Sequence, residues 1–223
     1  MNHAVILVVT ILSFQAMVKV SEDTSLVLDA DKDNVIYKES GKKSNGSGDY
    51  LFAGLNGGGS VRRSLIHFDL SKIPKNAVVS KVSVDLKVTR ANKAGSTVSL
   101  HRLKAAWGEG KSDAAGGEGG GAQALTGDTT WENAVYPNQN WETAGGHFKS
   151  EASAKIKLGR SGNAVWTSER LAQDVRDWIR NDSTNFGWIL IGDESLPGTA
   201  VRFGSRNNEK DKPRLRIEYS LEK

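Results

Sequence analysis

The chain has 223 residues, of which 38% are hydrophobic and 25% are charged, and this composition excludes a disordered chain. The length allows one sizeable core within a single domain. There is no cysteine, which excludes a disulfide scaffold, thiol chemistry and the usual zinc–thiolate sites. The formal net charge is +4, but the longest basic runs, Lys42-Lys43 and Arg62-Arg63, have only two residues. Nucleic-acid modules concentrate such charge in dense runs, so soluble anions or acidic polysaccharides are favoured as partners over nucleic acid.

The first twenty residues differ from the rest of the chain. Ala4–Leu12 is an almost unbroken apolar run that is too short to cross a bilayer but has the length of a signal-peptide apolar region. Phe14-Gln15-Ala16 and Ala16-Met17-Val18 are the candidate cleavage sites. We therefore expect residues 1–20 to be a signal peptide, residues 21–223 to form one domain, and the protein to be secreted. A first β-strand or an uncleaved anchor is the alternative.

After about residue 24, hydrophobicity mostly alternates with a period of two, which is typical of half-buried β-strands. The longest stretch puts these residues on one face: Val78, Ser80, Val82, Val84, Leu86 and Val88. Shorter strands are expected at Ser25–Asp29, Asn34–Lys38, Tyr50–Ala53, Arg62–Phe68, Thr97–Leu103, Ala154–Leu158, Trp188–Ile191, Ala200–Phe203 and Leu215–Tyr219. Many short strands separated by polar turns predict an all-β fold, an antiparallel β-sandwich.

One segment breaks this pattern. In Ser168–Arg180, apolar residues recur at helical spacing, Ser168 can cap the first turn, and Glu169 suits the positive end of the helix dipole. We expect one short amphipathic helix that covers an end of the sandwich, with Trp178 in the core.

Gly108–Gly127 holds eight glycines in twenty residues. Such a stretch cannot fill a core. It is either a flexible insertion or a loop whose backbone closely approaches an ion or ligand.

Acidic residues alternate along an extended segment near the N-terminal side of the domain. They are Asp29, Asp31, Asp33 and Glu39. Alternation puts the carboxylates on one side, at a spacing that oxygen ligands of calcium can use, so a structural calcium ion is one interpretation. A solvated edge that discourages edge-to-edge pairing of sheets is the other.

Basic residues fall on several predicted strands that could be neighbours. The candidate ligand-binding set is Lys42, Lys43, Arg62, Arg63, Lys87, His101, Arg102 and Arg202. If their polar faces coincide, they form a shallow cationic surface for carboxylated or sulfated sugars, because arginine forks match carboxylates. Ordinary surface charge is the alternative. Trp107, Trp131 and Trp141 lie in or beside turn-rich segments, where we expect them to cap the core rather than stack on sugar rings.

Signals for catalysis are weak. Glu109, Asp113 and Asp128 could supply the paired carboxylates of a glycosidase, but the sequence gives no separation between them. There is no H-E-x-x-H motif, and neither Ser64 nor Ser96 has a nucleophile-elbow context. We expect no catalytic residues.

Several strings, taken together and in order, resemble a known family. They are Arg62–Leu70, Trp107-Gly108-Glu109-Gly110, Gly127–Trp131, Gly145–Phe148, Asn185–Leu190, Arg202–Asn207 and Pro213–Tyr219. This pattern is similar to the DNRLRE domain family of exported proteins, which is itself similar to carbohydrate-binding modules attached to alginate lyases and to a domain of disaggregatases. The resemblance covers about residues 25 to 220. It implies a β-jelly-roll, an extracellular location, a structural calcium and, in some members, binding to acidic polysaccharide.

Two positions depart from that family pattern. Asn207 stands where the family usually has an acidic residue, and His147 stands where it usually has Asp. The function that we expect is a secreted, non-catalytic domain that binds acidic polysaccharide. A structural or adhesive surface domain with bound calcium is the alternative, and a polysaccharide lyase or hydrolase is a third.

Overall fold

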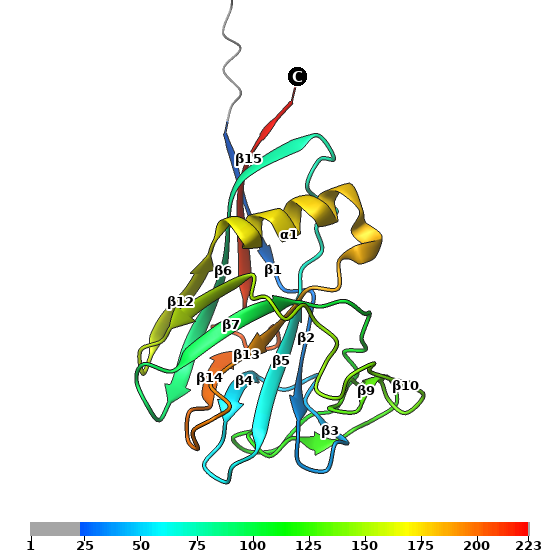
Figure 1. Cartoon of the computed structure of the whole chain (residues 1–223), viewed down its shortest axis with the longest axis vertical. Helices are drawn as coiled ribbons and strands as arrows, with labels where there is room; N and C mark the ends of the chain where they lie inside the picture. The colour runs from blue at the N-terminus through cyan, green and yellow to red at the C-terminus, as the bar shows by residue number, and fades with distance from the viewer. Residues whose placement is uncertain (1–22, 223) are drawn as a thin grey trace, which may run out of the picture.

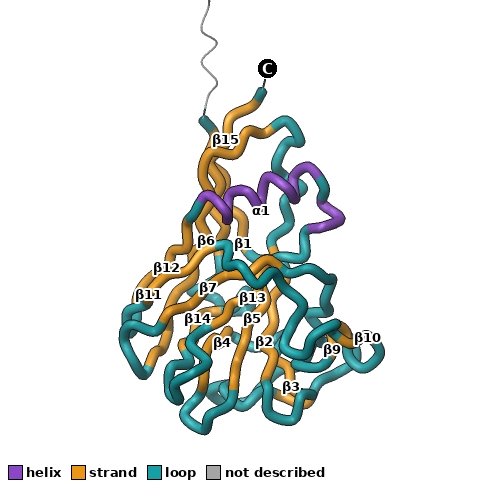
Figure 2. The backbone as a smooth tube through the Cα atoms, viewed as in Figure 1, coloured by secondary structure: helices purple, strands orange, loops and turns teal. Residues whose placement is uncertain are grey.

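The computed structural model describes residues 23–222. The signal peptide predicted for residues 1–20 lies outside these residues. Figures 1 and 2 show strands stacked in two layers, with one helix across them and with long loops around the end that lies away from the termini. The all-β, antiparallel sandwich predicted from the sequence is confirmed. The jelly-roll order of its connections stays a prediction.

The first layer, which we call sheet A, is built around one long strand. Its members are β1 (Thr24–Asp29), β4 (Tyr50–Leu55), β6 (Ala77–Ala91), β12 (Gly162–Thr167), β14 (Val201–Gly204) and β15 (Arg214–Leu221). β12 pairs with one edge of β6, while β15 and β14 pair with successive parts of the other edge. β1 extends the sheet beyond β15, and β4 extends it beyond β14.

The second layer, sheet B, lies opposite. Its members are β2 (Lys32–Tyr37), β3 (Lys43–Ser44), β5 (Val61–His67), β7 (Thr97–Arg102), β8 (Ala122–Gln123), β11 (Ala154–Lys157) and β13 (Trp188–Ile191). The two sheets join at one corner, because Gly54 and Leu55 of β4 also pair with β5. β9 (Asn133–Val135) and β10 (Gln139–Asn140) form a separate two-stranded ribbon.

The main core lies between the two sheets. Val84, Leu86 and Phe203 from sheet A are almost fully buried, and they meet Ile66 and Trp188 from sheet B in one hydrophobic cluster. Alternate residues of β6, such as Lys81 and Lys87, lie on the opposite face and are at least partly exposed. This follows from the period-two geometry of a strand, which leaves sheet A with one apolar and one polar face.

The predicted register of β6 is wrong at its first end. Val78 is 44% exposed, whereas its neighbour Val79 is 2% exposed and belongs to the core. The pairing with β15 shifts between Glu218 and Tyr219, and Ser80 donates a hydrogen bond to the Glu218 carbonyl. An irregularity of this kind inserts one unpaired residue, which exchanges the faces of the strand beyond it.

One helix, α1 (Glu169–Arg180), lies across the sandwich at the end nearer the termini (Figure 1), as predicted. The Ser168 hydroxyl accepts a hydrogen bond from the Leu171 amide at 3.0 Å, which caps the first turn. The helix buries Leu171, Val175 and Trp178 in the main core. The short 3-10 helix η1 (Asp182–Thr184) follows and leads into β13. In the described part of the chain, neither helix is long and apolar enough to cross a membrane.

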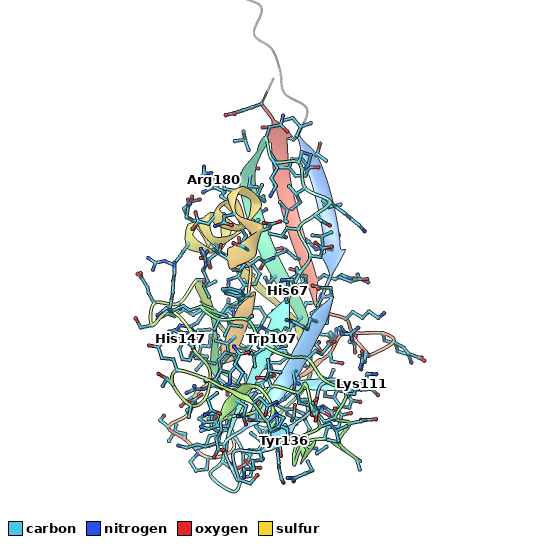
Figure 3. The ribbon with its side chains drawn as sticks, turned by 90° about the vertical axis from the view of Figure 1, so that its right-hand side faces the viewer. His67, Trp107, Lys111, Tyr136, His147 and Arg180 are labelled. Atoms are coloured by element: carbon cyan, nitrogen blue, oxygen red, sulfur yellow. The ribbon has the colours of Figure 1, made fainter. Side chains whose placement is uncertain are left out.

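A long loop layer, residues 103–150, covers much of the outer face of sheet B. A second hydrophobic cluster joins Leu65 and Ile189 of the sheet to Leu103, Trp107 and Trp141 of this layer. Figure 3 shows Trp107, Tyr136 and His147 on this side of the molecule. Around Leu65 and Ile189, sheet B is therefore buried on both faces, whereas the outer face of sheet A carries polar side chains.

Candidate anion-binding site

A cavity of about 390 Å³ opens where the polar face of sheet A meets the glycine-rich loop. Its lining comes from β4, β14, the end of β6 and the loop segment 115–120: Phe52, Asn56, Gly57, Arg62, Arg90, Asn92, Ala115, Gly117, Glu118, Gly119, Gly120, Ala200 and Arg202. Three arginines and one carboxylate face this cavity, which we call the arginine pocket.

Two of these arginines are directly opposed across neighbouring strands. Arg202 of β14 pairs with Arg90 of β6, and the pairing shifts before Phe203, which instead faces Val88. Like charges directly opposite on two strands destabilise a sheet, so an anion bound between them would relieve their repulsion. Among residues 23–222, no ion pair joins either arginine to a carboxylate.

Arg202 is held in place without using its outer donors. Its guanidinium carbon lies 3.8 Å from the centre of the Tyr50 ring, and its Nε donates to the Thr89 hydroxyl at 3.0 Å. The two terminal amino groups have no hydrogen-bond acceptor among the described residues. A guanidinium that stacks on an aromatic ring and keeps its fork open is suited to a bidentate contact with a carboxylate or sulfate.

The loop side of the pocket, which carries Glu118, is held in place by hydrogen bonds and a salt bridge within the protein. The Glu118 carboxylate accepts hydrogen bonds from the Asn45 amide group at 2.7 Å and from the backbone amides of Asp49 and Tyr50. Arg62 is 2% exposed, donates to the Gly119 carbonyl and forms a salt bridge with Glu39. Arg62 therefore holds the loop in position, and Arg90 and Arg202 are the cations left open to a ligand.

Beside this pocket, the glycine-rich segment packs closely against β2. Gly121 has φ +65°, and a Cβ there would lie 2.8 Å from ring atoms of Tyr37. The Tyr37 hydroxyl donates to the Glu118 carbonyl at 2.9 Å. The backbone approaches another part of the same chain closely, and this requires glycine.

The structure brings part of the predicted basic set together. Arg62 and Arg202 line the same pocket, and Lys87 lies farther along the polar face of β6. Lys43 does not line the pocket, but its ammonium group donates to the Gly120 carbonyl of the loop at 2.8 Å. Its neighbour Lys42 is exposed to solvent outside the pocket.

Arg63 does not belong to this surface. Its side chain projects from the outer face of sheet B, where it forms two hydrogen bonds with the Glu194 carboxylate and donates to the Gly145 carbonyl. Its guanidinium carbon also lies 4.8 Å from the Trp131 ring centre. Neighbouring strand residues point to opposite faces, so Arg62 and Arg63 cannot both serve one site.

Arg102 is a core residue rather than a ligand-binding one. It is 9% exposed and forms salt bridges with Asp174 and Asp177 of α1, with its guanidinium carbon 5.1 Å from the Trp178 ring centre. Its charge is therefore used to dock the helix against β7.

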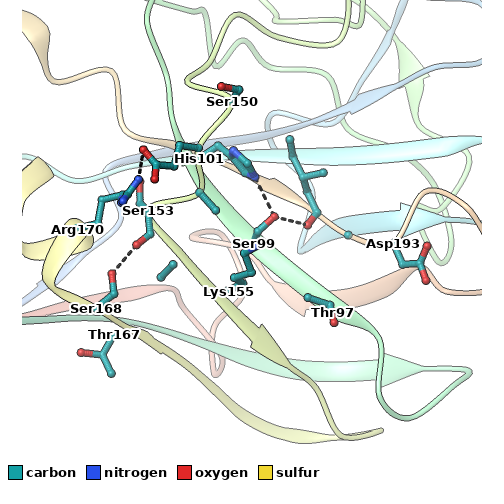
Figure 4. Close-up of a pocket in the computed structure, with 15 residues that line it drawn as sticks. Thr97, Ser99, His101, Ser150, Ser153, Lys155, Thr167, Ser168, Arg170 and Asp193 are labelled. Atoms are coloured by element: carbon teal, nitrogen blue, oxygen red, sulfur yellow. Dashed lines mark hydrogen bonds and ion pairs between the residues drawn. The ribbon is translucent and has the colours of Figure 1, made fainter.

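His101 lies in a separate, open cavity of about 710 Å³ beside β7 and β11 (Figure 4). Its Nδ1 contacts the Lys149 carbonyl at 2.9 Å, and its Nε2 contacts the Ser99 hydroxyl at 3.0 Å. Burial lowers the pKa of His101, so the imidazole is neutral at pH 7. A neutral ring held at both nitrogens does not act as a cationic donor for an anionic ligand.

The four predicted calcium ligands do not converge. Asp29 lies 3.4 Å from the Arg214 guanidinium, Asp31 pairs with His67, and Glu39 pairs with Arg62. No group of three metal-ligating side chains occurs in the part of the chain that the structure describes. These carboxylates do not fit a calcium site, because each has its own cationic or hydrogen-bonding partner.

Asp33, the fourth of them, lies in a buried cluster with a cation already in place. Its carboxylate accepts a hydrogen bond from the Arg206 amide at 2.6 Å, while the Arg206 guanidinium bonds to both oxygens of Glu109. Burial, with the nearby Glu109 charge adding to it, raises the pKa of Asp33 to about 7. The Arg206 side chain supplies here the positive charge that a metal would bring.

Two of the three acidic residues considered for catalysis are engaged in internal contacts. Glu109 is bound to Arg206, and Asp128 is fully buried and accepts backbone hydrogen bonds from Lys111, Ser112 and Leu125. Asp113 is exposed. Glu109 and Asp128 therefore hold loops in shape.

The tryptophans of the loop layer cap hydrophobic surface, as expected for two of them. The Trp107 indole donates to the Phe186 carbonyl and the Trp141 indole donates to the Thr130 carbonyl, both at 2.9 Å. Trp131 is half-buried under Arg63.

The sequence interpretation missed Arg90. Period-two counting puts this residue on the same face of β6 as Val88, which is the apolar face. The shift of pairing at Thr89 changes that register. The available signal was a charged residue in an apolar register near the end of a long strand, which is typical of such an irregularity.

No family model matches this chain, and no curated protein matches it.

Proposed function

We propose that this protein is a non-catalytic binding domain for acidic polysaccharide and that the arginine pocket is its binding site. The observation that carries the proposal is the directly opposed pair of Arg90 and Arg202, which has no carboxylate partner among the described residues. A polymer of uronate or sulfated sugars would supply the missing negative charge.

The surroundings of the pair support a sugar ligand rather than a small inorganic anion. Asn56 and Asn92 line the same cavity and can bond hydroxyl groups, and Phe52 adds apolar surface to its lining. The binding energy would come from charge-assisted hydrogen bonds in an open pocket, so salt should weaken it.

The test is retention on an immobilised polyuronate such as alginate, at low salt, with DNA–cellulose as a parallel column. We expect retention on the polyuronate that salt reverses. The double substitution Arg90→Gln with Arg202→Gln should raise the dissociation constant about tenfold or more, since hydrogen bonds to charged groups contribute about 1.5 to 3 kcal/mol each.

The matched control removes the same charge elsewhere. Lys104 and Arg180 are exposed and lie outside the arginine pocket, so the double substitution Lys104→Gln with Arg180→Gln should keep the affinity of the wild type. Elution of wild-type protein in the void volume would overturn the proposal. Equal losses of affinity in both double variants would mean that binding depends on overall charge and not on the arginine pocket. Stronger retention on DNA would mean that nucleic acid is the preferred ligand.

The non-catalytic part of the proposal is supported by the engagement of Glu109 and Asp128 in internal hydrogen bonds. Release of reducing ends or unsaturated uronates by the purified protein would contradict it. The extracellular part rests on the apolar run Ala4–Leu12. N-terminal sequencing of protein from the culture medium tests it, and a retained, full-length chain inside the cell would count against it.

A further inference from the structure

We propose that the binding surface continues along β6 into a second cationic groove, so that one acidic chain is held at two separate anion subsites. This inference rests on the proposed function and adds to it a requirement for chain length. The second groove, which we call the lysine groove, has a volume of about 190 Å³ and is lined by Asp85, Leu86, Lys87, Asn163, Val165, Lys210, Asp211, Lys212, Arg214 and Arg216.

The lysine groove has an excess of positive charge. Five of its lining residues are cationic and two are carboxylates, so the lining has a formal charge of +3. Arg216 is bonded to Asp85, and Arg214 lies 3.4 Å from Asp29.

Three lysines of the groove remain for a ligand. Lys87 reaches only the amide oxygen of Asn163, at 3.3 Å. Within residues 23–222, the ammonium groups of Lys210 and Lys212 have no hydrogen-bond or ion-pair partner. The carboxylate of Asp211 is the remaining acid of the groove, and it lies between these two lysines in the sequence.

The loop that carries the two exposed lysines is fixed in shape. The Asn208 side-chain oxygen accepts hydrogen bonds from the amides of Lys210 at 3.0 Å and Asp211 at 2.9 Å. A Cβ at Gly204 would lie 2.1 Å from the Asp211 carbonyl oxygen, so the loop packs tightly on β14. A loop that is already ordered loses less conformational entropy when it binds a ligand.

The two cationic sites are joined by one face of β6. Lys87 and Thr89 are two residues apart and project to the same side, and Thr89 bonds Arg202 of the arginine pocket. Lys87 and Arg90 are three residues apart, which corresponds to about 10 Å along a strand. One sugar ring cannot cover both sites, but a short oligomer with an acid group on each ring can.

This geometry predicts a particular kind of recognition. A chain bound at the arginine pocket brings its next acid groups to the lysine groove at high effective concentration, so affinity should rise with oligomer length until the chain spans both sites. Both sites are open along the sheet, so an internal segment of a long polymer can bind.

The experiment is calorimetric titration with a purified uronate disaccharide, tetrasaccharide and octasaccharide. For the wild type we expect the affinity to rise about tenfold or more from the shortest to the longest oligomer. The double substitution Lys210→Gln with Lys212→Gln should remove this gain and leave disaccharide binding unchanged. Both residues are exposed, so the variant should fold like the wild type.

The matched control is Lys72→Gln with Lys75→Gln, which removes two exposed lysines from the connection between β5 and β6. It should keep the full length dependence. Equal affinity for all lengths in the wild type, or an unchanged length dependence in the Lys210/Lys212 variant, would overturn the second subsite while disaccharide binding keeps the arginine pocket intact. Loss of all oligomer binding in the wild type would overturn both proposals.

Discussion

The guanidinium carbon of Arg202 lies 3.8 Å from the centre of the Tyr50 ring. The two residues are separated by most of the sequence, and they meet because they belong to neighbouring strands. The ring fixes the direction in which the arginine fork points. We therefore expect the stacked pair to act as one unit in the arginine pocket.

Replacement of Tyr50 by leucine should weaken binding of a uronate oligomer about two- to fivefold. An exposed cation–π contact contributes about 0.5 to 1 kcal/mol, and its loss lets the guanidinium move. The control is Tyr50→Phe, which keeps the ring and should bind like the wild type. Calorimetric titration measures both. Weak binding by the phenylalanine variant would show that the hydroxyl, and not the ring face, is what the ligand needs.

Replacement of Arg102 by alanine should lower the free energy of unfolding by about 3 to 5 kcal/mol. The change leaves Asp174, which is 4% exposed, without its cationic partner in the core, and a buried carboxylate that loses its partner is costly. Urea unfolding at neutral pH measures the loss.

An exposed ion pair of the same helix provides the comparison for Arg102. Arg170 pairs with Glu151 at the surface, so Arg170→Ala should cost less than about 1 kcal/mol. Folded Arg102→Ala protein should still bind the acidic ligand. A loss of binding without a loss of stability would mean that Arg102 belongs to the binding site.

The carboxyl group of Asp33 should make the protein less stable as pH rises. Burial raises its pKa from 3.8 to about 7 in the folded state, so the unfolded chain loses this proton first. The stabilising contribution is complete below about pH 4 and is lost by about pH 7. Asp33→Asn keeps an acceptor for the Arg206 amide and does not ionise, so its stability relative to wild type should increase from about pH 4 to about pH 8.

Asp31→Asn is the control with the opposite sign. Burial acts to raise the pKa of Asp31, but the hydrogen bond and charge of His67 outweigh it, so the pKa is lowered. Its stabilising contribution is present above the unfolded pKa and is lost as pH falls. Chemical unfolding of the three proteins distinguishes them if it extends below about pH 4, because the Asp31 contribution is lost only below its unfolded pKa. A pH-independent difference between Asp33→Asn and wild type would contradict the assigned pKa.

Substitution of two glycines of the loop layer allows the cost of backbone strain to be measured apart from the cost of steric overlap. Gly110 has φ +72° and Gly116 has φ +66°, so alanine is strained at both. A Cβ at Gly110 would lie 1.5 Å from a carboxylate oxygen of Asp128, whereas a Cβ at Gly116 meets nothing within 4 Å. Gly116→Ala should cost about 1 kcal/mol, and Gly110→Ala should cost clearly more because the buried Asp128 cannot move. Thermal unfolding measures both, and equal losses would mean that the loop shifts to accept the methyl group.

Much of the fold could be predicted from the sequence because strand periodicity is a local property. The alternation of Val82, Val84 and Leu86 predicts both the strand and its buried face. The same counting fails at Val78 and at Arg90, because irregular pairing with β15 and β14 changes the register at each end. These irregularities depend on the partner strand, which a local pattern does not contain.

β12 (Gly162–Thr167) was not predicted for a related reason. Ala164, Val165 and Trp166 are consecutive apolar residues between turn-forming residues, so the alternation is hidden. The structure shows the alternation, because Trp166 is fully buried while Val165 is 45% exposed.

The candidate site was predictable only in part, because charge alone does not tell which basic side chains remain unpaired. Arg62, Arg63 and Arg102 each find a carboxylate that is distant in sequence. Those pairings depend on how α1 and the loops pack against the sheets. Arg202 stays open to a ligand because its contacts, Tyr50 and Thr89, carry no charge.

The loop layer over sheet B also determines where this protein can change without losing its fold. Leu65 and Ile66 point to opposite faces of β5 and are both fully buried, so neither neighbour can vary without disturbing one of the two hydrophobic clusters. On β6, by contrast, Lys87 can be replaced while Leu86 and Val88 keep the core intact. New ligand preferences can therefore evolve by substitution at every second position of sheet A, at little cost to the stability of the domain.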